Sequence, residues 1–228
     1  MQDHKEASPV NPLPPVVVVL FLAMALPEVA FGLGARGLIG GPEAVGWRLA
    51  AVQTYSFSGD IFDWMVANGR WLPDHMIRFL SYSFVHVSFT STLFAAVLLL
   101  ALGKLVGEVL GQMAVVVLFF GGAIFGALIY GLLLNDPNWL VGGFPAVYGL
   151  IGGYSFVMWQ SLGARGEQQL RAFNLIAILM GLQLVWGVFF DVGNGWVADL
   201  AGFVFGFAAS AALVPGGIAR VIASMRRD

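Results

Sequence analysis

Hydrolytic chemistry in this chain would have to come from serine hydroxyls and an imidazole that lie within or beside its apolar segments. A serine nucleophile needs an imidazole within hydrogen-bonding reach to take its proton, and amide donors to stabilise the oxyanion. His86 is the histidine nearest to apolar sequence, because His4 and His75 belong to polar stretches. The hydroxyls available for such a role are Ser81, Ser83, Ser88, Ser91, Ser155, Ser161 and Ser210.

The spacing of these residues does not predict a serine and histidine pair. Ser155 should lie roughly 16 Å below Phe144 along a helix that rises about 1.5 Å per residue, and should therefore not meet His86. We expect serines inside helices to hydrogen-bond back to carbonyl groups of the preceding turn. Scattered histidines without an i, i+4 partner predict no metal site, no cofactor is expected, and the absence of cysteine excludes thiolate catalysis.

The composition is typical of a membrane protein. Apolar residues make up 59% of the chain and charged residues 11%, which is less than half of the roughly 25% found in soluble domains. Thirty glycines favour several closely packed helices, because small residues let helix backbones approach each other in lipid. A net charge of -2 without a basic patch argues against a nucleic-acid partner.

Six apolar segments are long enough to cross a bilayer, for which about 20 helical residues suffice. We expect an all-α, polytopic membrane bundle over residues 16–214, between a disordered, uncleaved tail at 1–15 and a basic tail at 215–228. The predicted spans cover about residues 16–33, 84–102, 114–134, 142–162, 172–190 and 197–214.

Residues 34–77, after the first span, are too polar to cross. They mix charged and aromatic side chains, and residues 46–53 and 61–66 have the amphipathic, tryptophan-bearing pattern of short helices that lie in the membrane interface. This segment is therefore predicted to be a long interfacial loop.

The distribution of lysine and arginine predicts that both termini are cytoplasmic. With six spans, the side that holds both termini carries seven basic residues, and the opposite side carries four. The first set is Lys5, Lys104, Arg165, Arg171, Arg220, Arg226 and Arg227, and the second is Arg36, Arg48, Arg70 and Arg78.

Four short strings of residues have a family resemblance in their order and spacing. The second span is opened by Arg78-Phe-Leu-Ser-Tyr-Ser-Phe-Val-His86 and closed by Gly103-Lys-Leu-Val-Gly107-Glu-Val-Leu-Gly111. The fourth span begins Gly142-Gly-Phe-Pro-Ala-Val-Tyr-Gly-Leu150, and the last contains Ala198-Asp-Leu-Ala-Gly-Phe-Val-Phe-Gly206. Over roughly residues 73–206 the chain resembles the rhomboid family of intramembrane serine proteases.

The resemblance implies that the catalytic pair of that family is missing here. The family's Gly-x-Ser-Gly core places Phe144 at the serine position and Pro145 at the glycine that follows, while Asp199 stands where the catalytic histidine would be. Phe144 has no hydroxyl that could act as a nucleophile. Pro145 has no backbone N–H, so it cannot donate a hydrogen bond to an oxyanion. The family's further histidine and asparagine on the second span are also replaced, at Thr90 or Ser91 and at Phe94 or Ala95.

The same resemblance places several other residues near the former active site. We expect Asp199 to point toward the hydroxyl of Tyr148, either as a carboxyl group without a function or as a polar clamp for a client segment. His86 is expected to hydrogen-bond to backbone in the outer loop, and otherwise to have a binding or pH-sensing role. The glycine spacing predicts a flat packing face of Gly202 and Gly206 against Gly149 and Gly153.

These features favour a catalytically inactive, rhomboid-like protein that binds transmembrane segments of client proteins without cleaving them. Two alternatives stay open: an active rhomboid protease with an unrecognised nucleophile, and a structural subunit of a larger membrane complex. A transporter is disfavoured because the chain lacks broken, repeated helices with ion ligands at mid-membrane. The expected partners are transmembrane proteins and the lipid bilayer, the oligomeric state stays open, and the short six-span form implies a bacterial inner membrane.

Overall fold

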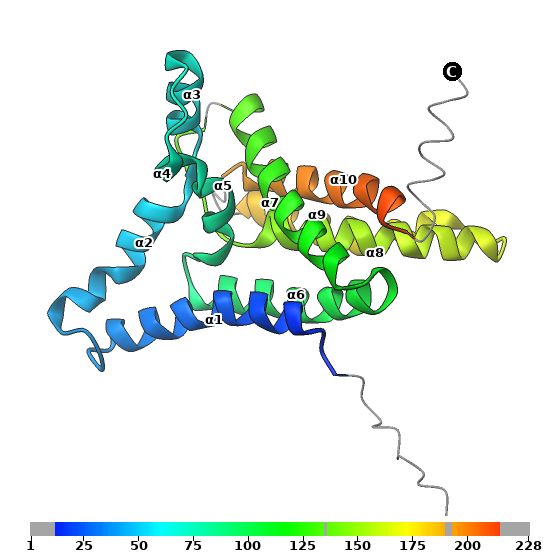
Figure 1. Cartoon of the computed structure of the whole chain (residues 1–228), viewed down its shortest axis with the longest axis horizontal. Helices are drawn as coiled ribbons and strands as arrows, with labels where there is room; N and C mark the ends of the chain where they lie inside the picture. Colours follow the sequence, from blue (N-terminus) through cyan, green and yellow to red (C-terminus); the bar gives the residue numbers. More distant parts are fainter. Residues whose placement is uncertain (1–11, 135, 190–192, 215–228) are drawn as a thin grey trace, which may run out of the picture.

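The computed structural model describes residues 12–134, 136–189 and 193–214, which form a helical bundle with one small sheet (Figure 1). The all-α class predicted from the sequence is confirmed. Residues 1–11 of the predicted N-terminal tail and the whole predicted basic tail, 215–228, lie outside the described residues. Pro15, which was predicted to belong to the N-terminal tail, is the first residue of the first helix. Proline is well tolerated in a first helical turn.

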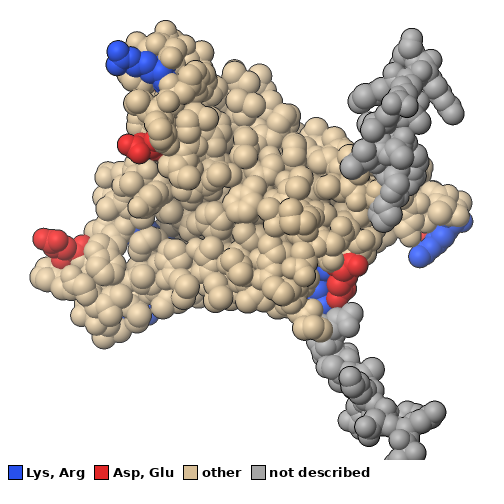
Figure 2. All heavy atoms as spheres, in the orientation of Figure 1, with Lys and Arg blue, Asp and Glu red and all other residues tan. Residues whose placement is uncertain are grey.

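Four helices in the described part of the chain are long and apolar enough to cross a membrane. Two more occupy the predicted fourth and fifth spans: α8 (Phe144–Ala164), which is less apolar, and α9 (Asn174–Phe189), which has 16 residues. The four are α1 (Pro15–Ala35), α6 (Phe89–Leu110), α7 (Gln112–Leu133) and α10 (Gly195–Leu213). The surface seen in Figure 2 agrees with a membrane setting, because its few charged side chains lie at the periphery.

Short helices fill the segment between α1 and α6. Of the two segments predicted to be helical, residues 47–53 fall within α2 (Trp47–Tyr55) and residues 61–66 within α3 (Gly59–Asn68), while Gly46 belongs to the preceding 3-10 turn. Strand β1 (Phe57–Ser58) separates α2 from α3 and pairs antiparallel with β2 (Trp139–Leu140), with Phe57 opposite Leu140. The other short elements are η1 (Pro42–Gly46), α4 (Pro73–Met76), α5 (Arg78–Ser81), η2 (Tyr82–Phe84) and η3 (Gln169–Phe173).

The second apolar helix begins and ends later than the predicted 84–102. The Ser88 side chain accepts a hydrogen bond from the Ser91 N–H at 3.2 Å and caps α6, so residues 85–88 form a connection. At the other end the predicted boundary at residue 102 is wrong. The helix continues to Leu110, with Lys104 and Glu108 paired one turn apart at 4.0 Å, and Gly111 reverses the chain with a φ of +89°.

Helix α8 is the central helix of the bundle and packs against α6, α7 and α10. Its contact with α10 brings the two backbones together, because a Cβ added at Gly206 would meet the carbonyl oxygen of Gly149, and one at Gly202 would meet that of Pro145. Gly153 lies against the side chains of Leu118 on α7 and Ser210 on α10. Glycine therefore sets the helix spacing where the candidate site begins.

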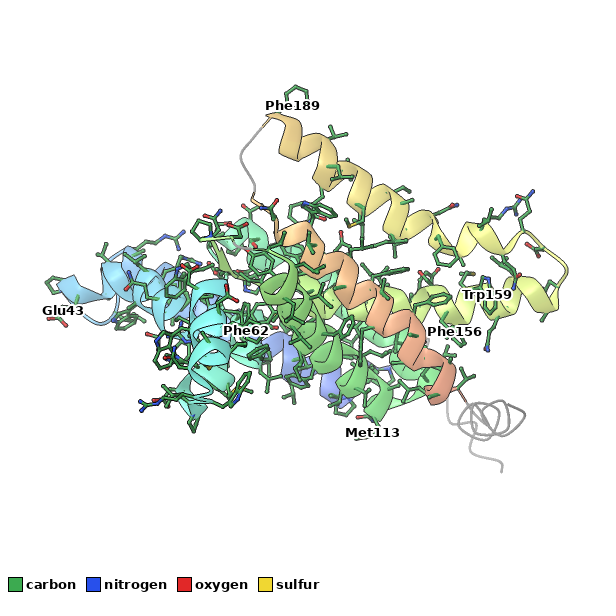
Figure 3. All side chains as sticks on the ribbon, turned by 90° about the horizontal axis from the view of Figure 1, so that it is seen from above. Glu43, Phe62, Met113, Phe156, Trp159 and Phe189 are labelled. Atoms are coloured by element: carbon green, nitrogen blue, oxygen red, sulfur yellow. The ribbon has the colours of Figure 1, made fainter. Side chains whose placement is uncertain are left out.

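The outer helices are held differently. Helix α1 packs along α6, where Val17 fills the space above Gly103. Helix α9 instead diverges from the bundle toward Phe189 (Figure 3). Its side chains at Leu182, Val185 and Phe189 are 62%, 57% and 74% exposed, so they are available to lipid or to another protein.

Candidate functional site

The turn before α8 is fixed by hydrogen bonds that its amides donate to η2 and to the connection between η2 and α6. Gly142, with a φ of +101°, donates its N–H to the carbonyl oxygen of Tyr82 at 3.0 Å. Gly143 donates its N–H to Nε2 of His86 at 3.1 Å. Tyr82 in turn donates its hydroxyl to the carbonyl oxygen of Ala123 on α7 at 2.8 Å. Three segments distant in sequence are thus joined at the N-terminus of α8.

His86 is a buried, neutral acceptor in this arrangement. Because its Nε2 accepts a hydrogen bond, the proton of the neutral ring is assigned to Nδ1. Burial lowers the pKa of His86 to about 4, with the carboxylate of Glu28 opposing this shift and the charge of Arg48 adding to it. The hydrogen bond to backbone that the sequence predicted is present, and the partner is Gly143 of the turn before α8.

Phe144 and Pro145 form the first turn of α8. Phe144 is half-buried at the edge of the core, and its ring and that of His86 both lie beside Gly142. Pro145 is buried in the first helical turn, where its missing N–H leaves no helical hydrogen bond unmade. Its carbonyl side faces Gly202, which links this turn to α10.

A hydrogen-bonded chain connects α8, α9 and α10. Asp199 on α10 is 3% exposed, and its Oδ2 accepts a hydrogen bond from Nε2 of Gln183 at 2.6 Å. Oε1 of Gln183 accepts a hydrogen bond from the hydroxyl of Tyr148 at 3.3 Å. The direct contact expected between Tyr148 and Asp199 is therefore replaced by a bridge through the glutamine amide, which can donate and accept at once. Gln183 was not foreseen, and the signal was an amide in an otherwise apolar span.

A second polar cluster lies where α1, α2 and α6 meet. Arg48 donates two hydrogen bonds to the carboxylate of Glu28, at 2.6 and 2.8 Å, and a third to the carbonyl oxygen of His86 at 2.9 Å. Thr92 donates its hydroxyl to Glu28 at 2.8 Å. The hydrogen bond to Glu28 raises the pKa of Arg48 despite its partial burial. The sequence indicated this cluster only through the acid at the end of the first apolar span.

The described serine side chains that form hydrogen bonds form them with backbone groups and not with the imidazole. Ser210 donates to the carbonyl oxygen of Gly206 at 2.7 Å, as predicted for a helical serine, and Ser81 donates to that of Tyr55 at 2.8 Å. Ser83 and Ser155 are fully buried, and their hydroxyls have no hydrogen-bond partner among the described residues. Over the same described ranges, no group of three His, Asp or Glu side chains could hold a metal ion.

The comparisons with known proteins agree with the residue patterns. A family model described as the Rhomboid domain matches residues 73–216, which is more than half of the chain. The match runs from α4 to the end of α10 and includes His86, Phe144 and Asp199. No curated protein matches the chain.

Proposed function

Because the chain belongs to the rhomboid family, we propose that it is a catalytically inactive member that binds transmembrane segments of client proteins without cleaving them. The observation that carries the proposal is that Phe144, and no hydroxyl-bearing residue, begins α8 beside the imidazole of His86. Hydrolysis by acyl transfer needs a nucleophile at such a helix start, within reach of a base.

The geometry of the possible bases supports the loss of catalysis. The Nε2 lone pair of His86 accepts a hydrogen bond from the Gly143 N–H, so it is not available to act as a base. The same N–H could otherwise have stabilised an oxyanion. Asp199, which we assign to the position of the family's catalytic histidine, accepts a hydrogen bond from the side-chain amide of Gln183. Removal of one member of a catalytic triad typically lowers the rate by several orders of magnitude, and here both the nucleophile and the base differ.

The packing of α9 supports binding of a client. This helix diverges from the bundle, while α8 and α10 stay closely packed through their glycines (Figure 3). A client segment entering beside α9 would meet Tyr148 and Asp199, and near the start of α8 it would meet Phe144, Pro145 and His86. These five residues are the candidate binding site.

The proposed topology has six spans, with α8 and α9 as the fourth and fifth. A span surrounded by other helices needs a less apolar surface than one that faces lipid, and α8 is enclosed by α6, α7 and α10. We place α2 and α3 in the membrane interface, because Leu49 on α2 and Trp64 on α3 are 63% and 44% exposed next to charged residues. The excess of basic residues places both termini in the cytoplasm, and the short six-span form favours a bacterial inner membrane.

The test is to incubate the purified full-length chain with single-span peptides and with a serine-reactive fluorophosphonate. We expect the peptides to bind and stay intact, and the protein to remain unlabelled. Specific labelling that one Ser→Ala change abolishes, at Ser83 or Ser155 for example, would instead favour an active protease. Purification with one stable, stoichiometric partner would favour the third reading, a subunit of a larger complex.

A further inference from the structure

Two helix-borne carboxylates are buried in the described bundle, and their surroundings differ. Glu28 on α1 is 7% exposed and has a cation, since Arg48 makes a two-pronged ion pair with it and Thr92 adds a hydroxyl. Asp199 on α10 is 3% exposed and accepts its hydrogen bond from the neutral amide of Gln183. The fold thus provides a counter-charge for one buried acid and a neutral donor for the other.

The missing counter-charge at Asp199 is unusual for an acid in a membrane. Within the described ranges, the ion pairs join Arg48 to Glu28, Lys104 to Glu108 and Arg171 to Glu167, so Asp199 takes part in none of them. A buried carboxylate is costly unless a cation or several donors compensate it, and acids within membrane spans commonly mark binding sites. This carboxyl group therefore suits a cation brought by another molecule.

The partner that Asp199 now has is well placed to be exchanged. Gln183 belongs to the diverging half of α9, where Leu182 and Leu184 are 62% and 52% exposed (Figure 3). A Cβ added at Gly181, two residues before the glutamine, would meet nothing within 4 Å, so the opposite face of α9 is open there. Among the described residues, the Gln183 side chain alone forms a hydrogen-bond link from α9 to Asp199. Movement of α9 would release the carboxylate without disturbing the contact of α8 with α10.

We propose that the preferred clients are transmembrane segments carrying a lysine or arginine at the depth of Asp199, whose cation replaces the Gln183 amide on the carboxylate. The idea rests on the proposed client-binding function and adds the chemistry of recognition. A basic residue in a lipid-facing span is itself unfavourable, and pairing with Asp199 would compensate both charges at once. The long, flexible stem of such a side chain could reach the carboxylate from a neighbouring helix.

The experiment uses the full chain in lipid bicelles and two matched single-span peptides, one with lysine and one with methionine at the same position. The position is moved along the peptide to find the matching depth. Because the chain has no cysteine, Leu170→Cys, at a side chain that is 81% exposed, takes a single fluorophore for a binding measurement by energy transfer. We expect the lysine peptide to bind about tenfold more tightly than the methionine peptide, as for a typical coupling between two sites.

Variants then assign this preference to the carboxylate. Asp199→Asn should reduce the ratio of the two affinities to about one, and Gln183→Leu should raise it because the competing amide is gone. Glu108→Gln removes a negative charge at the far end of α6 and should leave the ratio unchanged. The ratio is measured within each variant, so a general loss of affinity through partial unfolding cancels.

The outcomes separate this idea from the function on which it rests. Equal binding of both peptides at every position, or a preference that persists in Asp199→Asn, overturns the lysine-selective reading and leaves client binding intact. Failure of every peptide to bind overturns both.

Discussion

At the scale of single residues, two polar clusters of this bundle differ in their charges. One is an ion pair, Glu28 with Arg48, and the other is a carboxyl–amide chain, Asp199 with Gln183 and Tyr148. Only the second contains Tyr148 and Asp199, which the proposed function assigns to client binding. The first should therefore contribute to stability, and the second to binding.

The ion pair gives a prediction about stability. Arg48→Met leaves the Glu28 carboxylate buried without its cation, and should lower the free energy of unfolding by about 3 kcal/mol. The double variant Glu28→Gln, Arg48→Met should recover most of this loss, because no uncompensated charge remains. Unfolding in mixed micelles measures both, and a single variant as stable as the unmodified chain would contradict a structural role for this pair.

His86 gives a prediction about pH. Its pKa in the fold, about 4, lies below the ordinary value of 6.5, so the unfolded chain takes up a proton first. The stability that depends on neutral His86 is complete above pH 6.5 and is lost as the pH falls toward 4, by about 3 kcal/mol in total. His86→Gln retains an acceptor for Gly143 and should lack this component.

The measurement for His86 is the difference in unfolding free energy between the unmodified chain and His86→Gln from pH 7 to pH 4. The carboxylates titrate in both proteins and largely cancel. A difference that stays constant over this range would show that the imidazole is not held neutral by its burial.

At the scale of helices, the contact of α8 with α10 depends on glycine. Gly206→Ala would place a methyl group against the Gly149 carbonyl oxygen, and should destabilise the protein by about 2 kcal/mol through overpacking. The matched control is Gly32→Ala on α1, where an added Cβ meets nothing within 4 Å and the change should be tolerated. Similar unfolding curves for the two variants would argue against close packing of these helices.

The helices also show what the sequence can and cannot predict. Apolar length was enough to locate the four span-length apolar helices of the described residues, together with α8 and α9, because a run of apolar residues in a membrane chain has few other solutions. The ends of α6 were missed at both sides. They are decided by a cap at Ser88 and a left-handed turn at Gly111, while the polar side chains of Lys104 and Glu108 are compatible with continued helix.

Contacts between helices were predicted less completely than the helices themselves. The motif spacing of the family predicted Phe144, Tyr148 and Asp199 as site residues. The bridge through Gln183 and the ion pair of Glu28 with Arg48 depend instead on how α9 and α2 lie against the bundle. Sequence spacing defines faces along one helix, whereas these contacts join residues 16 to 64 positions apart. In both cases the sequence offered one indication of such a contact, a polar side chain inside an apolar span, namely Gln183 and Glu28.

At the scale of the whole molecule, the prediction is one of topology. With six spans and cytoplasmic termini, a reporter fused within residues 163–171 should be cytoplasmic, and one fused within 34–77 should face the opposite side. Paired fusions of a phosphatase and a fluorescent protein, each active on one side of an inner membrane, measure this directly. A fusion at 163–171 that reports the outer side would overturn the proposed orientation.

The most direct test of the account is to replace Phe144 with the photo-reactive analogue benzoylphenylalanine and to irradiate cells that produce the full chain. The analogue is close to phenylalanine in shape, and Phe144 begins α8 beside the imidazole of His86. Phe89 and Val97, which are 64% and 54% exposed, serve as lipid-facing controls for the same analogue. We expect intact membrane proteins to be crosslinked at Phe144, and far fewer to be crosslinked at the controls. Equal crosslinking at all three positions, or recovery of cleaved fragments at Phe144, would contradict a site that binds transmembrane segments without cutting them.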